Sequence, residues 1–175
     1  MNESFFNSPF EVGFRSAVIL GELFPQQCDL QRLVYFDYLL INSGDVPGGP
    51  RSLHPPTPFR SEEYAIRRDS LQRGLLLMAS KGIVDISVNA SGIEYGGNEL
   101  TIPFLDRLLN PYVHTLRENA RWLCANFSAT SDENLAALFA THLGRWGSEF
   151  LFMRDFSREL SALASQEQST DGLPT

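Results

Sequence analysis

The chain has 175 residues, of which 43% are hydrophobic and 20% charged, and its formal net charge at pH 7 is −7. This length and composition predict one folded domain with a hydrophobic core and leave no room for a large multidomain enzyme. Two cysteines cannot form a disulfide framework, no apolar run is long enough for a membrane span, and the amino terminus lacks signal-peptide features, so we expect a cytoplasmic protein.

Two helices are predicted within residues 8–44. Ser8, followed by proline and then by Glu11, is a typical helix start, because the serine caps free amides and proline suits the first helical position. This helix ends before Pro25. A second helix begins after Asp29, another capping residue, and ends at residues 42–44. The second helix is apolar nearly all round, so we expect it to be central.

Asp37 lies inside this apolar second helix. A buried carboxylate needs a partner, and we predict an internal ion pair with an arginine rather than a catalytic role. Cys28 precedes the same helix, where a helix amino terminus could activate a thiol, but an ordinary buried cysteine is the favoured interpretation.

Residues 44–60, GDVPGGPRSLHPPTPFR, contain five prolines and predict a long irregular loop. A third helix begins at residues 61–63 and ends at Gly82. Its expected core positions fall on one face of the helix: Tyr64, Leu71, Leu75 and Met78.

A short β-hairpin follows, with a first strand in which Val84, Ile86 and Val88 alternate with polar residues, a turn at residues 90–92, and a return strand. Three helices followed by a hairpin are typical of a winged helix. The predicted fold class is therefore mainly α with a short β-hairpin. We expect a winged-helix-like core at residues 8–100, including the proline loop, a helical extension packed on it at 101–164, and a disordered tail at 165–175.

The extension carries two apolar patterns. One is a seam with coiled-coil-like spacing from Leu109 to Phe127. The other lies on a predicted helix from Asp132 to about Leu163, whose aromatic residues occupy two faces. We predict that Trp146, Phe152 and Phe156 form a surface for a partner; a fully intramolecular helical cap is the alternative.

No catalytic constellation is found in the sequence. The three histidines lack the i, i+4 spacing of helical metal ligands, and phosphate-binding glycine loops and nucleophile elbows are absent. We therefore predict a protein that is not an enzyme and that has no metal and no cofactor.

DNA binding by the third helix is not favoured. Relative to Leu71, Arg67 lies at about −40°, Arg68 at about +60° and Arg73 at about −160° at 100° per residue, so only Arg73 clearly faces away from the core. Arg73 and Lys81 are the candidate DNA contacts, but acidic residues share the face. Any DNA contact is expected only within a larger complex.

Arg67 and Arg68 instead flank the core face, where their guanidinium groups need acceptors such as Asp37 or loop carbonyls. We predict that these arginines pin the proline loop as a rigid unit that docks a partner protein; a merely structural cover is the alternative. The residues of this hypothetical unit are Asp37, Leu53, His54, Pro55, Arg60, Arg67 and Arg68.

Four segments carry a family resemblance: DLQRLVYFDYLL, SLHPPTPFRSEEYAIRRDSLQRGLLLMASKGIVD, a glycine turn ending in GIEY, and FLDRLLNPYVHTLRENARWL. Over about residues 8–127 the chain resembles the small middle component of bacterial three-component ABC-ATPase anti-phage systems, called LmuC in Lamassu-type systems. The resemblance implies a non-catalytic subunit that assembles with an SMC-like ABC ATPase and an effector, commonly a nuclease. Two alternatives are a free-standing winged-helix regulator that dimerises through the Leu109–Phe127 seam, and a small enzyme of unseen type.

Overall fold

The computed structural model describes residues 8–54, 63–90 and 92–143. It contains these elements: α1 (Pro9–Leu23), β1 (Gln27–Asp29), α2 (Leu30–Ile41), the 3-10 helix η2 (Ser43–Asp45), α3 (Glu63–Ser80), β2 (Val84–Asn89), β3 (Gly92–Gly97), α4 (Thr101–Asp106), α5 (Pro111–Phe127) and α6 (Asp132–Leu143). The predicted fold class, mainly α with a short hairpin, is confirmed. The chain forms two compact units, Met1–Asp132 and Glu133–Thr175.

Side-chain caps fix the starts of the helices. Ser8 accepts a hydrogen bond from the amide of Glu11 at 3.3 Å, and Asp29 accepts one from the amide of Arg32 at 2.7 Å, as the sequence indicates. Asn110 caps α5 in the same way, which places Leu109 outside the helix and 92% exposed. The prediction that Leu109 begins the apolar seam is therefore wrong.

The sheet has three antiparallel strands in the order β1-β3-β2, with Tyr95 of β3 opposite both Cys28 and Ile86. The β2–β3 hairpin is the predicted one. Strand β1 was not predicted, because three residues are too few to show an alternating pattern. This strand connects α1 to α2 and ties the hairpin to the start of α2.

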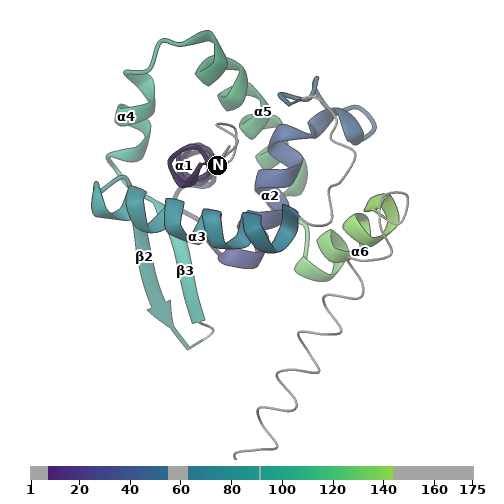
Figure 1. Cartoon of the computed structure of the whole chain (residues 1–175), viewed down its shortest axis with the longest axis horizontal. Coiled ribbons are helices and arrows are strands. Elements are labelled where there is room, and N and C mark those ends of the chain that lie inside the picture. Colours follow the sequence, from purple (N-terminus) through teal and green to yellow (C-terminus); the bar gives the residue numbers. More distant parts are fainter. Residues whose placement is uncertain (1–7, 55–62, 91, 144–175) are drawn as a thin grey trace, which may run out of the picture. The chain divides into compact units, whose positions relative to one another are not determined.

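The core of the first unit surrounds α1. Every residue from Val12 to Leu20 is buried, and α1 packs against α2, α3, α4, α5 and β3. Figure 1 shows α1 end-on with these helices around it. The sequence predicted α2 as the central helix; α2 is largely buried, but α1 has the most complete enclosure. The buried stretch of α1 from Val12 to Leu20 is shielded from water, so its polar residues need internal partners.

Two glycines allow α1 and α3 to cross closely. A Cβ atom on Gly13 would overlap the backbone of Gly74, and a Cβ on Gly74 would overlap the backbone of Pro9 and Gly13. Any larger residue at this crossing would force the helices apart. The crossing carries the buried face of α3, where Leu71, Leu75 and Met78 lie as predicted.

Several predictions fall outside the described residues. They concern Pro55 and Arg60 of the loop, the side chain of Tyr64, the proposed partner surface at Trp146, Phe152 and Phe156, and the tail at 165–175. Helix α6 is described to Leu143, so the predicted helix up to Leu163 is described only in its first part.

Candidate functional site

Asp37 forms a buried ion pair with Arg15. The Arg15 Nε lies 2.6 Å from Oδ1 of Asp37, its Nη2 lies 3.0 Å from Oδ2, and both side chains are 0% exposed. Burial alone would raise the pKa of Asp37, but the charges and hydrogen bonds of Arg15, with a contribution from Arg67, hold that pKa below its usual value. The expected arginine partner is therefore present, although the closest one is Arg15, which the sequence analysis did not single out.

Further charged groups surround this pair. Arg67 of α3 reaches Asp37 with an Nη1–Oδ2 distance of 3.5 Å, Glu11 lies 3.1 Å from Arg15, and Nε2 of His54 lies 3.8 Å from Glu11. Burial and the positive charge of Arg15 lower the pKa of His54. The charge cluster, which we define as these five residues, joins α1, α2, α3 and the segment that follows η2.

The start of the proline loop is held by backbone and amide contacts. The amides of Leu53 and His54 donate to the carbonyl of Ile41 at 2.9 and 3.4 Å. The buried amide group of Asn119, on α5, donates to the carbonyls of Leu40 and Arg51 and to the hydroxyl of Ser43 at 3.1–3.4 Å. The sequence analysis missed Asn119, whose one signal is a polar residue on the inner side of an amphipathic helix.

Arg68 lies outside the charge cluster. Its Nη1 donates to Oε1 of Gln31 at 3.0 Å in an exposed contact between α3 and α2. In the described residues Arg68 thus holds two helices together at the surface, and the loop up to His54 is held by Asn119 and by the end of α2 instead. The pinning role predicted for Arg68 concerns a loop segment that lies mostly outside the described residues, so it stays a prediction.

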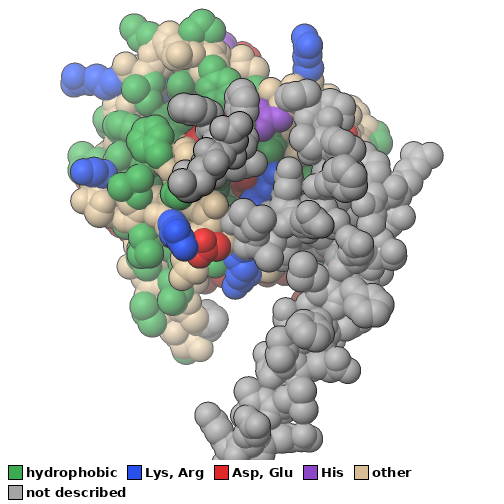
Figure 2. Space-filling view, viewed as in Figure 1, with side chains coloured by type: hydrophobic (Ala, Val, Ile, Leu, Met, Phe, Trp, Pro, Cys, Tyr) green, Lys and Arg blue, Asp and Glu red, His purple; other side chains and the backbone are tan. Residues whose placement is uncertain are grey.

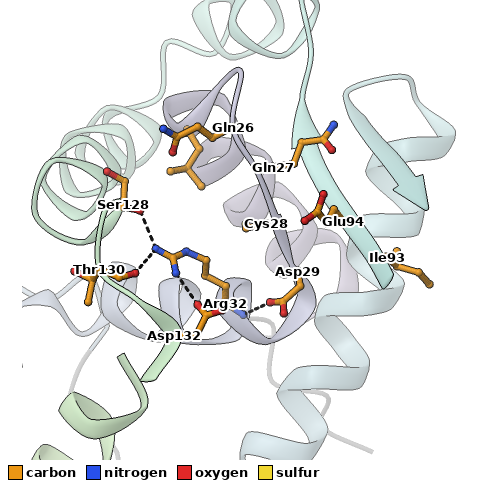
Figure 3. Close-up of a pocket in the computed structure, with 11 residues that line it drawn as sticks. Gln26, Gln27, Cys28, Asp29, Arg32, Ile93, Glu94, Ser128, Thr130 and Asp132 are labelled. Carbon is orange, nitrogen blue, oxygen red and sulfur yellow. Dashed lines mark hydrogen bonds and ion pairs between the residues drawn. The ribbon is translucent and has the colours of Figure 1, made fainter. Parts of the chain in front are cut away.

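A second polar region lies beside Arg32, in a pocket of about 420 Å³ between β1 and the segment after α5 (Figure 3). Arg32 donates to the carbonyls of Phe127, Ser128 and Thr130 at 2.8–3.1 Å and pairs with Asp132 at 2.6 Å. Burial raises the pKa of the adjacent Cys28 thiol to about 12, so the thiol is protonated at neutral pH and is a poor nucleophile.

The outer face of α3 carries mixed charge. Arg73 is exposed and pairs with Asp69 at 3.0 Å, and Lys81 is exposed at the end of the helix. The predicted cation on this face is therefore partly neutralised by its neighbour.

Within residues 8–54, 63–90 and 92–143, no group of three or more His, Cys, Asp or Glu side chains is placed to hold a metal ion. None of the described helices combines the length and the apolar character that crossing a bilayer requires.

Taken together, these features define a small, mainly helical protein whose described ionisable clusters serve to join its own elements. The chain belongs to the family ABC-three component (ABC-3C) system Middle Component 2, whose model matches residues 5–149. It is thus a middle component of an ABC-three-component system. No curated protein and no solved structure matches the chain.

Proposed function

We propose that this middle component is a non-catalytic assembly subunit, which joins an SMC-like ABC ATPase to an effector nuclease in a bacterial anti-phage defence complex of the Lamassu type. The observation that carries the proposal is the family match over residues 5–149, since middle components are named for their place in a three-component system. The Lamassu assignment and the identities of the two partners rest on the sequence resemblance.

The geometry of the charge cluster supports a non-catalytic role. Asp37 and Arg15 are fully buried and bonded to each other, and they have no exposed surface for a substrate. The buried thiol of Cys28 is protonated at neutral pH. A catalytic acid or base must reach its substrate, and Asp37 and Arg15 do not. Cys28 lines the pocket beside Arg32, but its protonated thiol is a poor nucleophile.

We propose a winged-helix-like core at residues 8–100 and a helical extension at 101–164. The element order α1-β1-α2-α3-β2-β3, with β3 in the middle of the sheet, supports the core assignment. The packing of α5 against α1 and α2 supports the extension in its first part. We propose that the complex acts in the cytoplasm. We also propose that this subunit contacts DNA, through Arg73 and Lys81, only within the assembled complex.

Co-expression with the ATPase and effector components of the same three-component system tests the assembly role. With an affinity tag on the ATPase component, we expect the untagged full chain to co-purify in a fixed ratio through size exclusion. The purified chain alone should neither turn over ATP nor cleave DNA. A chain that elutes alone in the presence of both components contradicts assembly, and metal-dependent DNA cleavage that is lost in His54→Ala contradicts the non-catalytic role.

A further inference from the structure

An apolar groove of about 680 Å³ lies where α1, the end of α3, α4 and the start of α5 meet. Its lining includes Phe10 and Phe14 of α1, Met78 of α3, Phe104 of α4 and Val113 of α5. Phe14 and Phe104 meet edge to face with ring centroids 6.5 Å apart, so two of the lining aromatic rings pack against each other. Figure 2 shows hydrophobic side chains on the left of the view, where Figure 1 places α4.

Two of the groove's apolar residues stand out from the surface. Phe10 is 63% exposed and Leu109, in the segment between α4 and α5, is 92% exposed. Small-molecule sites enclose most of their ligand within a preformed cavity, whereas side chains that project into water are covered only by another large surface. This arrangement favours a polypeptide over a small apolar ligand.

The charged residues around the groove indicate which charge a bound polypeptide would carry. Lys81 and Arg107 line it, and among the residues that the structure describes no acidic side chain does. Both cations are exposed, and in the described part of the chain neither forms an ion pair. Since the whole chain carries a net charge of −7, two basic residues beside an apolar groove form a local exception. Such a groove is complementary to an apolar segment flanked by carboxylates.

We propose that this groove binds an amphipathic helix of another component of the system, which buries apolar side chains at helical spacing and presents Asp or Glu to Lys81 and Arg107. This inference rests on the proposed function only for the origin of the helix. A second copy of the chain docking through the same face is disfavoured, because a twofold contact would bring Lys81 and Arg107 of both copies together.

Two designed peptides test the groove on the purified full chain. Both are helical, about 18 residues long, with leucines at i, i+3, i+4 and i+7; one carries glutamates and the other lysines at the flanking positions. By fluorescence anisotropy we expect the acidic peptide to bind and the basic peptide not to bind. The double variant Lys81→Glu/Arg107→Glu should weaken acidic-peptide binding about tenfold or more and favour the basic peptide. Leu109→Asp should abolish binding.

Arg51→Glu is the matched control, since it reverses an exposed charge that does not line the groove. It should leave acidic-peptide binding unchanged. Failure of both peptides to bind, or equal binding of both by the parent and the double variant, overturns the proposal. A parent dimer in light scattering that Leu109→Asp converts to monomer also overturns it, because the occupant is then a second copy.

The same variants separate this inference from the assembly role. If the parent chain co-purifies with the ATPase component and Leu109→Asp does not, while circular dichroism shows the variant folded, the groove is the docking site. If parent, Leu109→Asp and the double variant all co-purify equally, the groove inference is wrong and the assembly role stands. If the parent itself fails to co-purify, the assembly role is wrong, and the peptide measurements still decide the groove.

Discussion

Asp37 determines how the first unit holds its helices together. A carboxylate that is 0% exposed must be neutralised or paired, and this one remains ionised because Arg15 meets both of its oxygens. The second arginine, Arg67, and the outlying Glu11 balance the remaining charge. Removing one member leaves its partner charged and buried, which is the costly case.

Replacing Arg15 should therefore destabilise the protein strongly. We expect Arg15→Met, which keeps the apolar volume of the side chain, to lower the free energy of unfolding in urea by about 3–5 kcal/mol. The control Arg73→Met removes an exposed arginine that pairs with Asp69, and should change it by less than about 1 kcal/mol. Equal effects of the two changes would contradict the structural role of the buried pair.

The two neighbouring arginines of α3, Arg67 and Arg68, should differ in how much they stabilise the folded protein. Arg67 has 8% of its side chain exposed and contacts Asp37, so Arg67→Ala should cost about 1–3 kcal/mol by chemical denaturation. Arg68 makes an exposed contact with Gln31, so Arg68→Ala should cost within about 0.5 kcal/mol. A loss at position 68 as large as that at 67 would support the sequence-based expectation that both arginines pin the loop.

His54 should make stability depend on pH. Its pKa is lowered from about 6.5 by burial and by the charge of Arg15, so the folded protein binds this proton less readily than the unfolded chain. The stability that His54 contributes is present above about pH 6.5 and is lost as pH falls through its folded-state pKa. Glu11, whose pKa is raised by burial, acts in the opposite direction.

Thermal midpoints measured at about pH 7.5 and 5.5 check this expectation. The decrease on acidification should be smaller in His54→Asn than in the parent. His114→Asn, which changes an exposed histidine on α5, serves as the control and should keep the parental decrease. An identical decrease in all three proteins would show that His54 is not the group responsible.

At the scale of elements, helix starts could be predicted from the sequence because a cap is a local signal. Ser8 and Asp29 were identified by residue type and position alone. The error at Leu109 arose because the heptad spacing was extended across Asn110 and Pro111, which begin a new helix. The close crossing of α1 and α3 was missed, since a glycine in one helix does not indicate which element it will meet.

The close crossing of α1 and α3 should make the protein sensitive to larger residues at its two glycines. Gly13→Ala and Gly74→Ala should each destabilise the protein by about 1–3 kcal/mol in urea unfolding, because the added methyl group meets backbone that cannot rotate away. Gln72→Ala, at an exposed position of the same helix α3, should stay within about 0.5 kcal/mol. Higher stability of either glycine variant, as alanine's helix propensity alone would give, would contradict the close approach.

For the whole molecule, the sequence indicated the fold class and the partner requirement of Asp37, but not which arginine meets it. Arg15 is as unusual in the apolar helix α1 as Asp37 is in α2, and the pairing of two such residues across 22 positions depends on how the helices pack. The groove could not be predicted either. Phe10 and Phe104 are distant in the chain and line one surface only after folding.

The net charge of the whole molecule predicts how strongly it binds DNA. With −7 overall and Arg73 paired with Asp69, the isolated chain should bind duplex DNA only weakly near 150 mM salt, because few phosphates can be neutralised. Electrophoretic mobility and anisotropy titrations check this. Submicromolar binding that is lost in Arg73→Ala would instead favour a free-standing DNA-binding regulator.

The contacts of Arg32 bear on how the protein can be divided. The guanidinium of Arg32, on α2, donates hydrogen bonds to carbonyls at and just after the end of α5 and to the carboxylate of Asp132. These acceptors lie about a hundred positions further along the chain. A shortened version that stopped at Phe127, the last residue of α5, would remove three of these four acceptors and leave the cation beside an unfinished helix end. A fragment made for crystallisation or domain-swap experiments should therefore end after Asp132.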